Sequence, residues 1–398
     1  MKFITSQFRR NYHPYLYGLV LSLMVLLLCC QTPTEESPVT ELRGVWVTNV
    51  ASDVLDSRES IEEAVTFLSD HHFNVIYPVV WNDAFTLYPS AVMDSLFGIK
   101  IDPRFAGRDP LAELIEVAHR YNMAVVPWFE YGFAASYHKS GGSLIEKFPH
   151  WAARDEEGAL LTKNGFEWMN GFHPEVQEFI LALIREVVEN YAVDGIQGDD
   201  RLPAQPSEGG YSEYTRSLYQ EETGNTPPAN AKDTTWLRWR ADRLTEFAGK
   251  VYKTVKEADP DICVTWSPSI FPWSTQEYLQ DWPEWMRQGY SEFVHPQNYR
   301  YSFERYKTTV DILHPDTLDI PAALMEQIYP GILMQVDNYL ISPEYLLEAV
   351  AYNRAKGFQG EVYFFYEGLR ANDGLLADTL LATWYREPAL LPRPFRSK

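Results

Sequence analysis

Short apolar segments that alternate with helix-like segments run through almost the whole chain, and this alternation constrains its fold more than any other feature. Strands rich in β-branched or aromatic residues are expected at 43–49, 74–80, 123–129, 194–199, 262–266, 292–294, 320–325 and 361–365. Helical spacing of apolar residues predicts helices between them, at 57–71, 110–118, 174–191, 241–258, 303–313, 343–356 and 375–385. Strands and helices in this order predict an α/β fold of the (β/α)8 type, a TIM barrel.

Two long polar segments break the regular alternation. Residues 133–172 follow the third predicted strand and residues 201–235 follow the fourth, so long loops are expected there. An open, doubly wound sheet is the alternative fold, but a nucleotide-binding sheet would need a glycine-rich turn after its first strand, and Gly44 alone does not supply one. We therefore expect one barrel domain over residues 41–387, followed by a proline-rich, unstructured tail over residues 388–398.

The amino terminus has the pattern of an export signal. Basic residues precede an apolar run at 17–28, and Cys29 and Cys30 end that run. The run is shorter than the ~20 residues that cross a bilayer and fits the apolar core of a signal peptide. We expect residues 1–30 to be a lipoprotein signal with Cys30 lipidated, and residues 31–40 to be a disordered tether. The protein would then be exported and lipid-anchored to the bacterial cell envelope, at the outer membrane or the periplasmic face. An ordinary secretory signal with incidental cysteines is the alternative.

Charge and composition exclude several classes of function. The net charge of −21 disfavours binding to nucleic acid and to anionic lipid headgroups. The nine histidines lack the pairing that a zinc site needs, so neither a metal nor another cofactor is expected. No Gly-x-Ser-x-Gly motif is present, which disfavours a serine hydrolase. The remaining cysteine, Cys263, lies in an apolar strand, and no disulfide framework is indicated.

Amides, carboxylates and aromatic rings gather where the predicted strands end. TIM-barrel enzymes place their sites at these carboxyl ends, and such a mixture of groups is typical of sites for hydroxyl-rich ligands. Substrate contacts are expected from Asn49, Trp81, Asp83, Trp128, Gln197, Arg201, Trp266, Ser267, Gln297, Asn298 and Tyr299.

The segment 194–201 is the strongest candidate for the centre of the site. Alternation within its strand places Gln197 and Asp199 on one face, toward the barrel axis. Asp199 is therefore the predicted catalytic carboxylate. Asp200, which begins the loop, has either a catalytic role or a structural one, as a cap or as a partner for Arg201.

Glycoside hydrolysis needs a second carboxyl group across the scissile bond from the first. Glu130 and Glu367 both follow strands and are both predicted to be catalytic. We favour Glu367 as the acid because its strand lies across the ring from that of Asp199. The aromatic residues of the segment 363–366 should also give it an apolar setting that raises its pKa. Glu130, one strand from Asp199, would then bind substrate or tune the pKa of its neighbour.

Four stretches carry a resemblance to a known family. They are 41–47, 109–132 (which ends in Trp128-Phe129-Glu130-Tyr131-Gly132), 172–201 (which ends in Asp194-Gly195-Ile196-Gln197-Gly198-Asp199-Asp200-Arg201) and 296–299. In these the chain resembles the glycosyl-hydrolase-like 10 family of bacterial (β/α)8 barrels. The resemblance implies a secreted or lipid-anchored glycosidase, which in the best-understood cases acts on peptidoglycan glycan strands.

The same segment is also similar to the strand-four motif of α-amylase-like barrels. The last Asp of that motif is the nucleophile, here Asp199. The fifth strand lacks the Glu that those enzymes use as acid, so the acid must come from another strand. We therefore expect a lipid-anchored hydrolase of glycosidic bonds in a polysaccharide, with a cell-wall glycan as substrate. A non-catalytic glycan-binding lipoprotein on the same fold is the main alternative, and a metal-dependent polysaccharide deacetylase is a second one that the histidine pattern disfavours.

Overall fold

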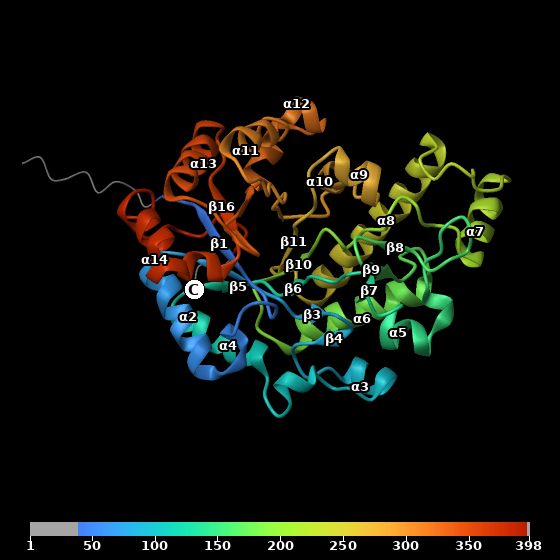
Figure 1. The fold of residues 1–398 in the computed structure, drawn as a ribbon, viewed down its shortest axis with the longest axis horizontal. Helices are drawn as coiled ribbons and strands as arrows, with labels where there is room; N and C mark the ends of the chain where they lie inside the picture. The colour runs from blue at the N-terminus through green and yellow to red at the C-terminus, as the bar shows by residue number, and fades with distance from the viewer. Residues whose placement is uncertain (1–38, 396–398) are drawn as a thin grey trace, which may run out of the picture. The chain divides into compact units, whose positions relative to one another are not determined.

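Parallel strands occupy eight positions around the core of the fold (Figure 1). The structure is a computed structural model that describes residues 39–395. Within this range the strands are β1 (Leu42–Val47), β2 (Val75–Pro78), β5 (Ala124–Val125) continued by β6 (Trp128–Phe129), β10 (Gly195–Gly198), β11 (Cys263–Trp266), β12 (Phe293–Val294), β13 (Gly331–Leu333) and β16 (Gly360–Phe364). The predicted (β/α)8 barrel is confirmed.

The ring consists of two sheets that are joined at two seams. One sheet has the order β13-β16-β1-β2-β5 and the other has the order β12-β11-β10-β6. Isolated bridges join them, Val79 to Trp128 at one seam, and Val294 to Ile328 and Gln297 to Gly331 at the other. Proline lies at both seams, Pro127 at the first and Pro296 at the second. Because proline has no N–H to donate, the ladder is interrupted there and the barrel is not closed by continuous pairing.

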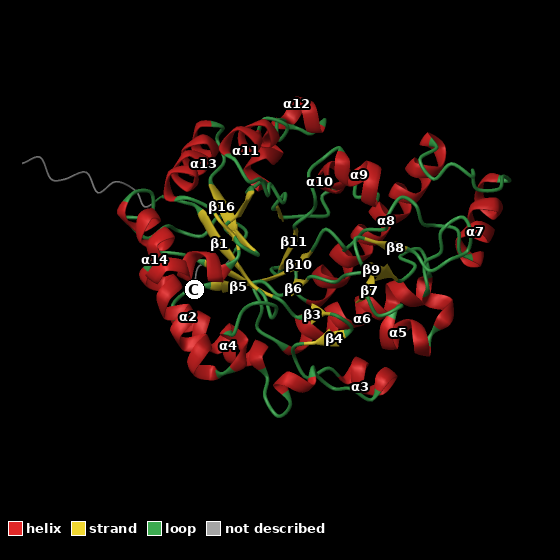
Figure 2. Cartoon of the chain, in the orientation of Figure 1, coloured by secondary structure: helices red, strands yellow, loops and turns green. Residues whose placement is uncertain are grey.

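Helices cover the outside of the ring (Figure 2). The main ones are α2 (Arg58–Asp70), α4 (Pro110–Arg120), α6 (Pro174–Asn190), α8 (Thr234–Ala258), α11 (Phe303–Val310), α13 (Pro343–Ala355) and α14 (Tyr366–Ala382). Their starts follow local capping chemistry. The Asp109 side chain accepts from the backbone N–H of Ala112, and Pro110 occupies the first turn of α4. Asp233 caps α8 in the same way, which is why that helix begins at Thr234 rather than near Ala241.

The predicted seventh strand at 320–325 is wrong. Residues Ala322–Gln327 form a 3-10 helix, η4, and β13 fills the seventh position instead. Pro321 begins the segment, and the residues that follow it are mostly good helix formers, so a helical turn is favoured. The short strand Gly331–Leu333 pairs with β16 and completes the ring.

Both predicted long loops are present and have structure of their own. The segment after β6 forms an antiparallel sheet of β7 (Ala134–Tyr137), β9 (Phe166–Trp168) and β8 (Thr162–Lys163), with α5 (Gly142–Lys147). The segment after β10 contains α7 (Glu213–Thr223). These excursions leave the barrel at the carboxyl ends of the strands, where the candidate residues lie.

The chain ends were expected to be unstructured, and this is wrong for the described part of them. Leu390 accepts from the backbone N–H of Glu41 at 3.0 Å and donates to Val39 at 2.8 Å. The Phe395 ring is buried and stacks on Phe293, with ring centroids 5.1 Å apart. The predicted signal, Cys30 and nearly all of the predicted tether lie outside the described residues. Within residues 39–395, no helix is long and apolar enough to cross a membrane.

A buried ionic network joins the first and last strands at their amino-terminal ends. The Glu361 carboxylate is fully buried and accepts from Arg354 at 2.7 and 3.1 Å and from the Tyr385 hydroxyl at 2.6 Å. Arg354 also binds Glu41 at 2.9 Å, and Glu41 binds Arg43. Burial alone would raise the pKa of Glu361, but the Arg354 guanidinium and the hydroxyls outweigh burial and lower it.

Replacing this carboxylate should reduce stability in a pH-dependent way. Because the pKa of Glu361 is lower in the folded state than in the unfolded state, its contribution is present above about pH 4.3 and is lost as pH falls through the folded pKa. We expect Glu361→Gln to lower the free energy of unfolding by about 2–3 kcal/mol at pH 7, since Arg354 keeps Glu41 as a partner. Urea denaturation at pH 7 and below pH 4 measures this loss of stability.

The loss caused by Glu361→Gln should be smaller at the lower pH. The control Glu348→Gln, at an exposed position of α13, should lower the free energy of unfolding little at either pH. An equal cost for Glu361→Gln at both pH values would contradict the assignment.

Candidate active site

The end of β10 places Asp199 at the mouth of the barrel. Gly198 precedes it, and a Cβ atom there would lie 2.5 Å from the Trp266 ring, so only glycine lets the strand pass this close. The Asp199 carbonyl then accepts from the backbone N–H of Leu202 at 3.0 Å and from the Gln280 side chain at 2.9 Å. The backbone on both sides of Asp199 is thereby fixed.

One guanidinium, that of Arg201, contacts three carboxyl groups. Its Nη2 lies 3.1 Å from Asp199 Oδ2 and 3.4 Å from Glu130 Oε1, and its Nη1 lies 3.1 Å from Asp200 Oδ1. We call Asp199, Asp200 and Glu130 the carboxyl cluster. Because the same nitrogen contacts Asp199 and Glu130, their nearest oxygens cannot be farther apart than these two distances together. This upper limit allows the separation of about 5 Å at which the two carboxyl groups of retaining glycosidases work.

Asp199 accepts hydrogen bonds from three side chains. Besides Arg201, Ser267 donates its hydroxyl at 3.0 Å and Gln297 donates its amide at 2.7 Å, both to Oδ1. Ser267 follows β11 and Gln297 follows β12, so neighbouring strands converge on this carboxylate. The structure thus brings Ser267, Gln297 and Arg201 to Asp199. Donors of this kind favour the ionised form of a carboxyl group.

Glu130 has fewer donors. Asn82 donates to its Oε2 at 2.5 Å, and Arg201 donates to its backbone carbonyl at 3.0 Å. Asn82 lies in the short strand β3 (Trp81–Asn82), directly after the predicted second strand, and was not among the expected site residues. Asn82 stands between Trp81 and Asp83, which were both expected site residues, and this position was the sequence signal that could have identified it.

The charges of the cluster are not balanced. Burial raises the pKa of Asp199, the charge of Asp200 adds to this, and Arg201 opposes it. Burial also raises the pKa of Glu130, again opposed by Arg201. One guanidinium does not neutralise three carboxylates in a buried setting, so the cluster as a whole binds a proton more readily than isolated carboxyls do. A protonated acid beside an ionised carboxylate is the arrangement that acid–base catalysis needs.

Aromatic rings hold the Arg201 side chain in place. Its guanidinium carbon lies 4.7 Å from the Phe166 ring centroid and 5.7 Å from that of Tyr131. Phe166 belongs to β9, in the excursion after β6, and nothing in its local sequence marks it as part of the site. Such cation–π contacts stabilise a cation whose charge is only partly exposed to water.

Beneath the cluster, an aromatic floor fills the barrel. The Trp46 indole N–H donates to Gln197 Oε1 at 2.6 Å, and the Trp46 ring packs against Trp128 and Tyr299. Gln197 Nε2 and Trp128 Nε1 are buried and have no hydrogen-bond partner within residues 39–395. Buried donors of this kind are common where a ligand or water completes the set.

Three of the expected substrate contacts are bonded within the protein. Trp81, Trp266 and Asn298 are wholly buried, and their contacts with a substrate stay predictions. Trp81 donates to the Gly132 carbonyl at 3.1 Å, and Trp266 donates to the Tyr290 carbonyl at 2.9 Å. The Asn298 side chain is bonded to residues of α11. A place at the end of a strand does not determine whether a side chain points into the mouth or into the surrounding layer.

Two other expected contacts lie farther from the cluster. Asp83 follows β3 and forms an ion pair with Lys139 at 2.5 Å, between two loops at the mouth. Asn49 is half-buried, and its backbone carbonyl accepts from Arg104 at 2.7 Å. Their roles in binding a substrate stay predictions.

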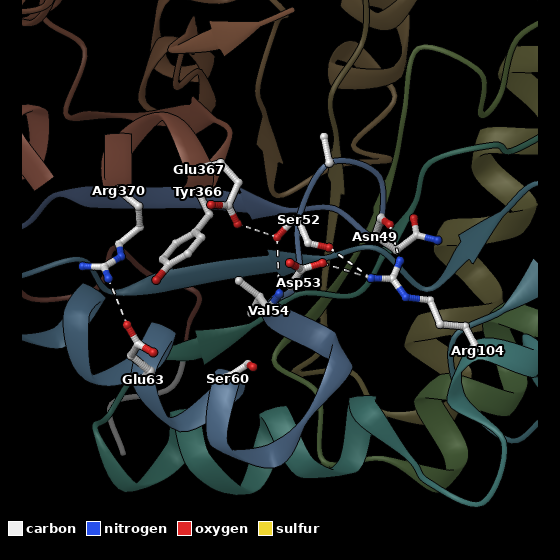
Figure 3. A pocket seen from close by; sticks show the side chains of 11 residues that line it. Asn49, Ser52, Asp53, Val54, Ser60, Glu63, Arg104, Tyr366, Glu367 and Arg370 are labelled. Atoms are coloured by element: carbon white, nitrogen blue, oxygen red, sulfur yellow. Dashed lines mark hydrogen bonds and ion pairs between the residues drawn. The ribbon is translucent and has the colours of Figure 1, made fainter. Parts of the chain in front are cut away.

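Glu367 lies in a separate polar pocket (Figure 3). This pocket has a volume of about 540 Å³ and lies between the loops that follow β1 and β16. Glu367 accepts from the Ser52 hydroxyl at 2.7 Å, and Asp53, Arg104 and Arg370 also line the pocket. The expected apolar, aromatic setting is therefore wrong. Within residues 39–395, no hydrogen bond or ion pair links Glu367 to the carboxyl cluster or to Arg201.

The described part of the chain also holds no group of three or more His, Cys, Asp or Glu side chains arranged to hold a metal ion.

Solved structures share this fold. The glycoside hydrolase domain of PgaB (BpsB) from Bordetella bronchiseptica is similar with a TM-score of 0.63 and 14% identity, over 85% of this chain and 98% of that domain. The catalytic domain of β-amylase from Paenibacillus polymyxa is similar with a TM-score of 0.59 and 10% identity, over 88% of this chain and all (100%) of that one. At these identities the likeness shows the fold alone.

Sequence comparison shows the family. Glycosyl hydrolase YngK of Bacillus subtilis (strain 168) is 24% identical over 388 residues, which cover 89% of this chain and 73% of that protein. Glycosyl hydrolase DigH of Escherichia coli (strain K12) is 24% identical over 374 residues, which cover 79% of this chain and 81% of that protein. The family described as glycosyl hydrolase-like 10 matches residues 41–341. With most of the barrel inside that match, the chain belongs to the glycosyl hydrolase-like 10 family.

Proposed function

We propose that this protein hydrolyses glycosidic bonds in the glycan strands of peptidoglycan, with Asp199 and Glu130 as the catalytic pair. The observation that carries the proposal is the carboxyl cluster around Arg201 at the mouth of the barrel. The family supports glycan hydrolysis in general. The choice of peptidoglycan rests on what the family resemblance implies.

The hydrogen bonds divide the roles. Asp199 accepts from Arg201, Ser267 and Gln297, and these donors favour its charged form, while burial and the charge of Asp200 raise its pKa. It is the carboxylate that stabilises positive charge at the anomeric carbon. Burial raises the pKa of Glu130 as well, so the difference lies in the contacts: Glu130 has a longer ion pair with Arg201, at 3.4 Å, and among the described residues its carboxyl group accepts otherwise only from Asn82. It is the acid.

In the reaction, Glu130 donates its proton to the bridging oxygen as the bond from that oxygen to the anomeric carbon breaks. Asp199 stabilises the electron-poor carbon while this happens. Water then adds to that carbon, and its proton restores the acid on Glu130. Asp200 shares Arg201 with both groups, so its charge tunes their protonation.

We also propose that the protein is exported and anchored in the bacterial cell envelope through a lipid on Cys30. This proposal rests on the sequence, in which a short apolar run ends in Cys29 and Cys30 ahead of a polar segment.

Asp199→Asn should abolish most of the activity without changing the fold, because it keeps the shape of the side chain and removes its charge. We expect turnover to fall by about 10³-fold or more, by analogy with other groups that act in the transition state. The assay is release of reducing ends from peptide-free peptidoglycan strands, with thermal melting as the check on folding. Asp316→Asn, at an exposed aspartate of α12 (Pro315–Leu318), is the control. Near-normal turnover by Asp199→Asn would overturn the assignment. Strand binding without product from the wild type would instead favour the non-catalytic alternative.

The choice between Glu130 and Glu367 as acid can be tested through the leaving group. A variant that lacks the acid should lose cleavage of natural strands but retain its rate on glycosyl fluorides, because an activated leaving group needs no proton. We expect Glu130→Gln to show this pattern and Glu367→Gln to affect both substrates alike or neither. The reverse pattern would return the role to Glu367, which the position of its strand had favoured.

The anchor is tested by Cys30→Ser, with Cys29→Ser as the matched control. We expect the Cys30 variant to appear folded in the soluble fraction and the Cys29 variant to stay with the membranes, because a lipidated cysteine fixes the protein to the bilayer. Mass spectrometry of the wild-type amino terminus should show added acyl chains. An unmodified Cys30 in the wild type would rule the anchor out.

A further inference from the structure

A second cavity adjoins the carboxyl cluster. It has a volume of about 470 Å³ and lies between the loops that follow β11 and β12. Gln297 is common to both sites, because it lines this cavity and donates to Asp199 at 2.7 Å. A ligand whose reacting bond lies at Asp199 therefore has room to extend into this cavity.

Aromatic side chains line the cavity. Trp273, in α9 (Trp273–Tyr278), is 48% exposed, and Phe271 and Tyr299 lie beside it in the lining. An exposed tryptophan offers a flat face on which the apolar side of a sugar ring can pack. This part of the lining suits a sugar ring better than a bare ion.

Arg300 supplies a positive charge in the same lining. It is half-buried, and its Nη1 donates to the Tyr299 carbonyl at 2.7 Å. Among the described residues it has no carboxylate partner. Arg104 and Arg370, which line the pocket of Glu367, form ion pairs with Asp56 and Glu63.

The charge of Arg300 is therefore available to a ligand. Burial lowers the pKa of its guanidinium, and the nearby charge of Arg305 acts in the same direction. An arginine nevertheless remains charged at neutral pH. A guanidinium that is half-buried without an anion gains most from a ligand that brings one.

We propose that this cavity is a glycan subsite that selects a sugar residue bearing a free carboxylate, with Arg300 binding the carboxylate and Trp273 binding the ring. The proposal rests on the function proposed above and adds a specificity to it. The chain carries a net charge of −21, and the carboxyl cluster lies next to the cavity, so an anionic sugar would be repelled without a cation in the subsite. The positive charge of Arg300 offsets that repulsion and makes the subsite prefer an anionic sugar.

The test compares one glycan in two forms. Peptide-free peptidoglycan fragments carry free lactyl carboxylates, and chemical reduction converts these to alcohols while leaving the backbone unchanged. Binding is measured by calorimetry in the Asp199→Asn background, so that no cleavage intervenes. We expect the carboxylate form to bind about 10- to 100-fold more tightly, the size of one charge-assisted contact.

Substitutions then assign the preference to a residue. Arg300→Gln in the same background should bring the ratio of the two dissociation constants close to one, and Arg300→Lys should retain part of it, because lysine keeps the charge but not the paired donors. Arg305→Gln removes the same charge from an exposed position nearby and should leave the ratio unchanged. Thermal melting verifies that each variant is folded.

The outcomes separate this proposal from the proposed function. Equal binding of the two forms, or a preference that survives Arg300→Gln, overturns the subsite even if the wild type cleaves strands. A preference that depends on Arg300 supports the subsite even if the wild type releases no reducing ends. Absence of binding to either form also overturns it.

Discussion

The ion pair between Arg354 and Glu361 is the contact on which the closure of the barrel depends. A barrel requires its first and last strands to lie side by side, and here β1 pairs with β16 in the register that sets Leu42 against Gly360. Glu41, the residue before Leu42, forms an ion pair with Arg354, and Arg354 also binds the buried Glu361. A buried carboxylate is stable only when its charge is compensated, and in this register Arg354 compensates Glu361 and Glu41 together. Arg354 thus favours the register in which Glu41 and Glu361 lie together, and that register sets where β1 and β16 end at the opposite face.

The two ends of the barrel use charge in contrasting ways. At the amino-terminal ends of the strands, Glu41 and Glu361 are matched by Arg43 and Arg354, so the network is balanced. At the carboxyl ends, one guanidinium, that of Arg201, contacts three carboxyl groups. In a balanced buried network each carboxylate stays ionised and does not exchange protons. An unbalanced one holds protons that can be moved, and this is the physical difference between a structural cluster and a reactive one.

Much of the fold follows from local patterns that are present in the sequence. Strand alternation correctly placed Gln197 and Asp199 on the inner face, and capping residues such as Asp109 marked helix starts. The prediction of the seventh strand failed because β13 is a short segment whose strand character comes from its neighbours in the ring rather than from its own composition.

The site was harder to predict than the fold because its members meet only in three dimensions. Glu130 directly follows β6, whereas Glu367 lies in the first turn of α14 after β16, so one meets Arg201 and the other meets Ser52. Asn82 and Phe166 likewise reach the cluster through loop paths that no local periodicity encodes. The prediction of Glu367 as the acid used only the positions of the strands in the ring, and these positions do not determine the paths of the loops.

The contact between Phe166 and Arg201 has a consequence for how proteins of this family diverge. The ring that covers the guanidinium comes from the excursion after β6 and not from the barrel itself. Loops tolerate insertion and replacement far better than strands do. A change in this excursion can therefore alter how strongly Arg201 is shielded from water, and with it the proton affinity of the acids it contacts, while every strand remains as it was. Working pH and scaffold can evolve independently in a molecule built this way.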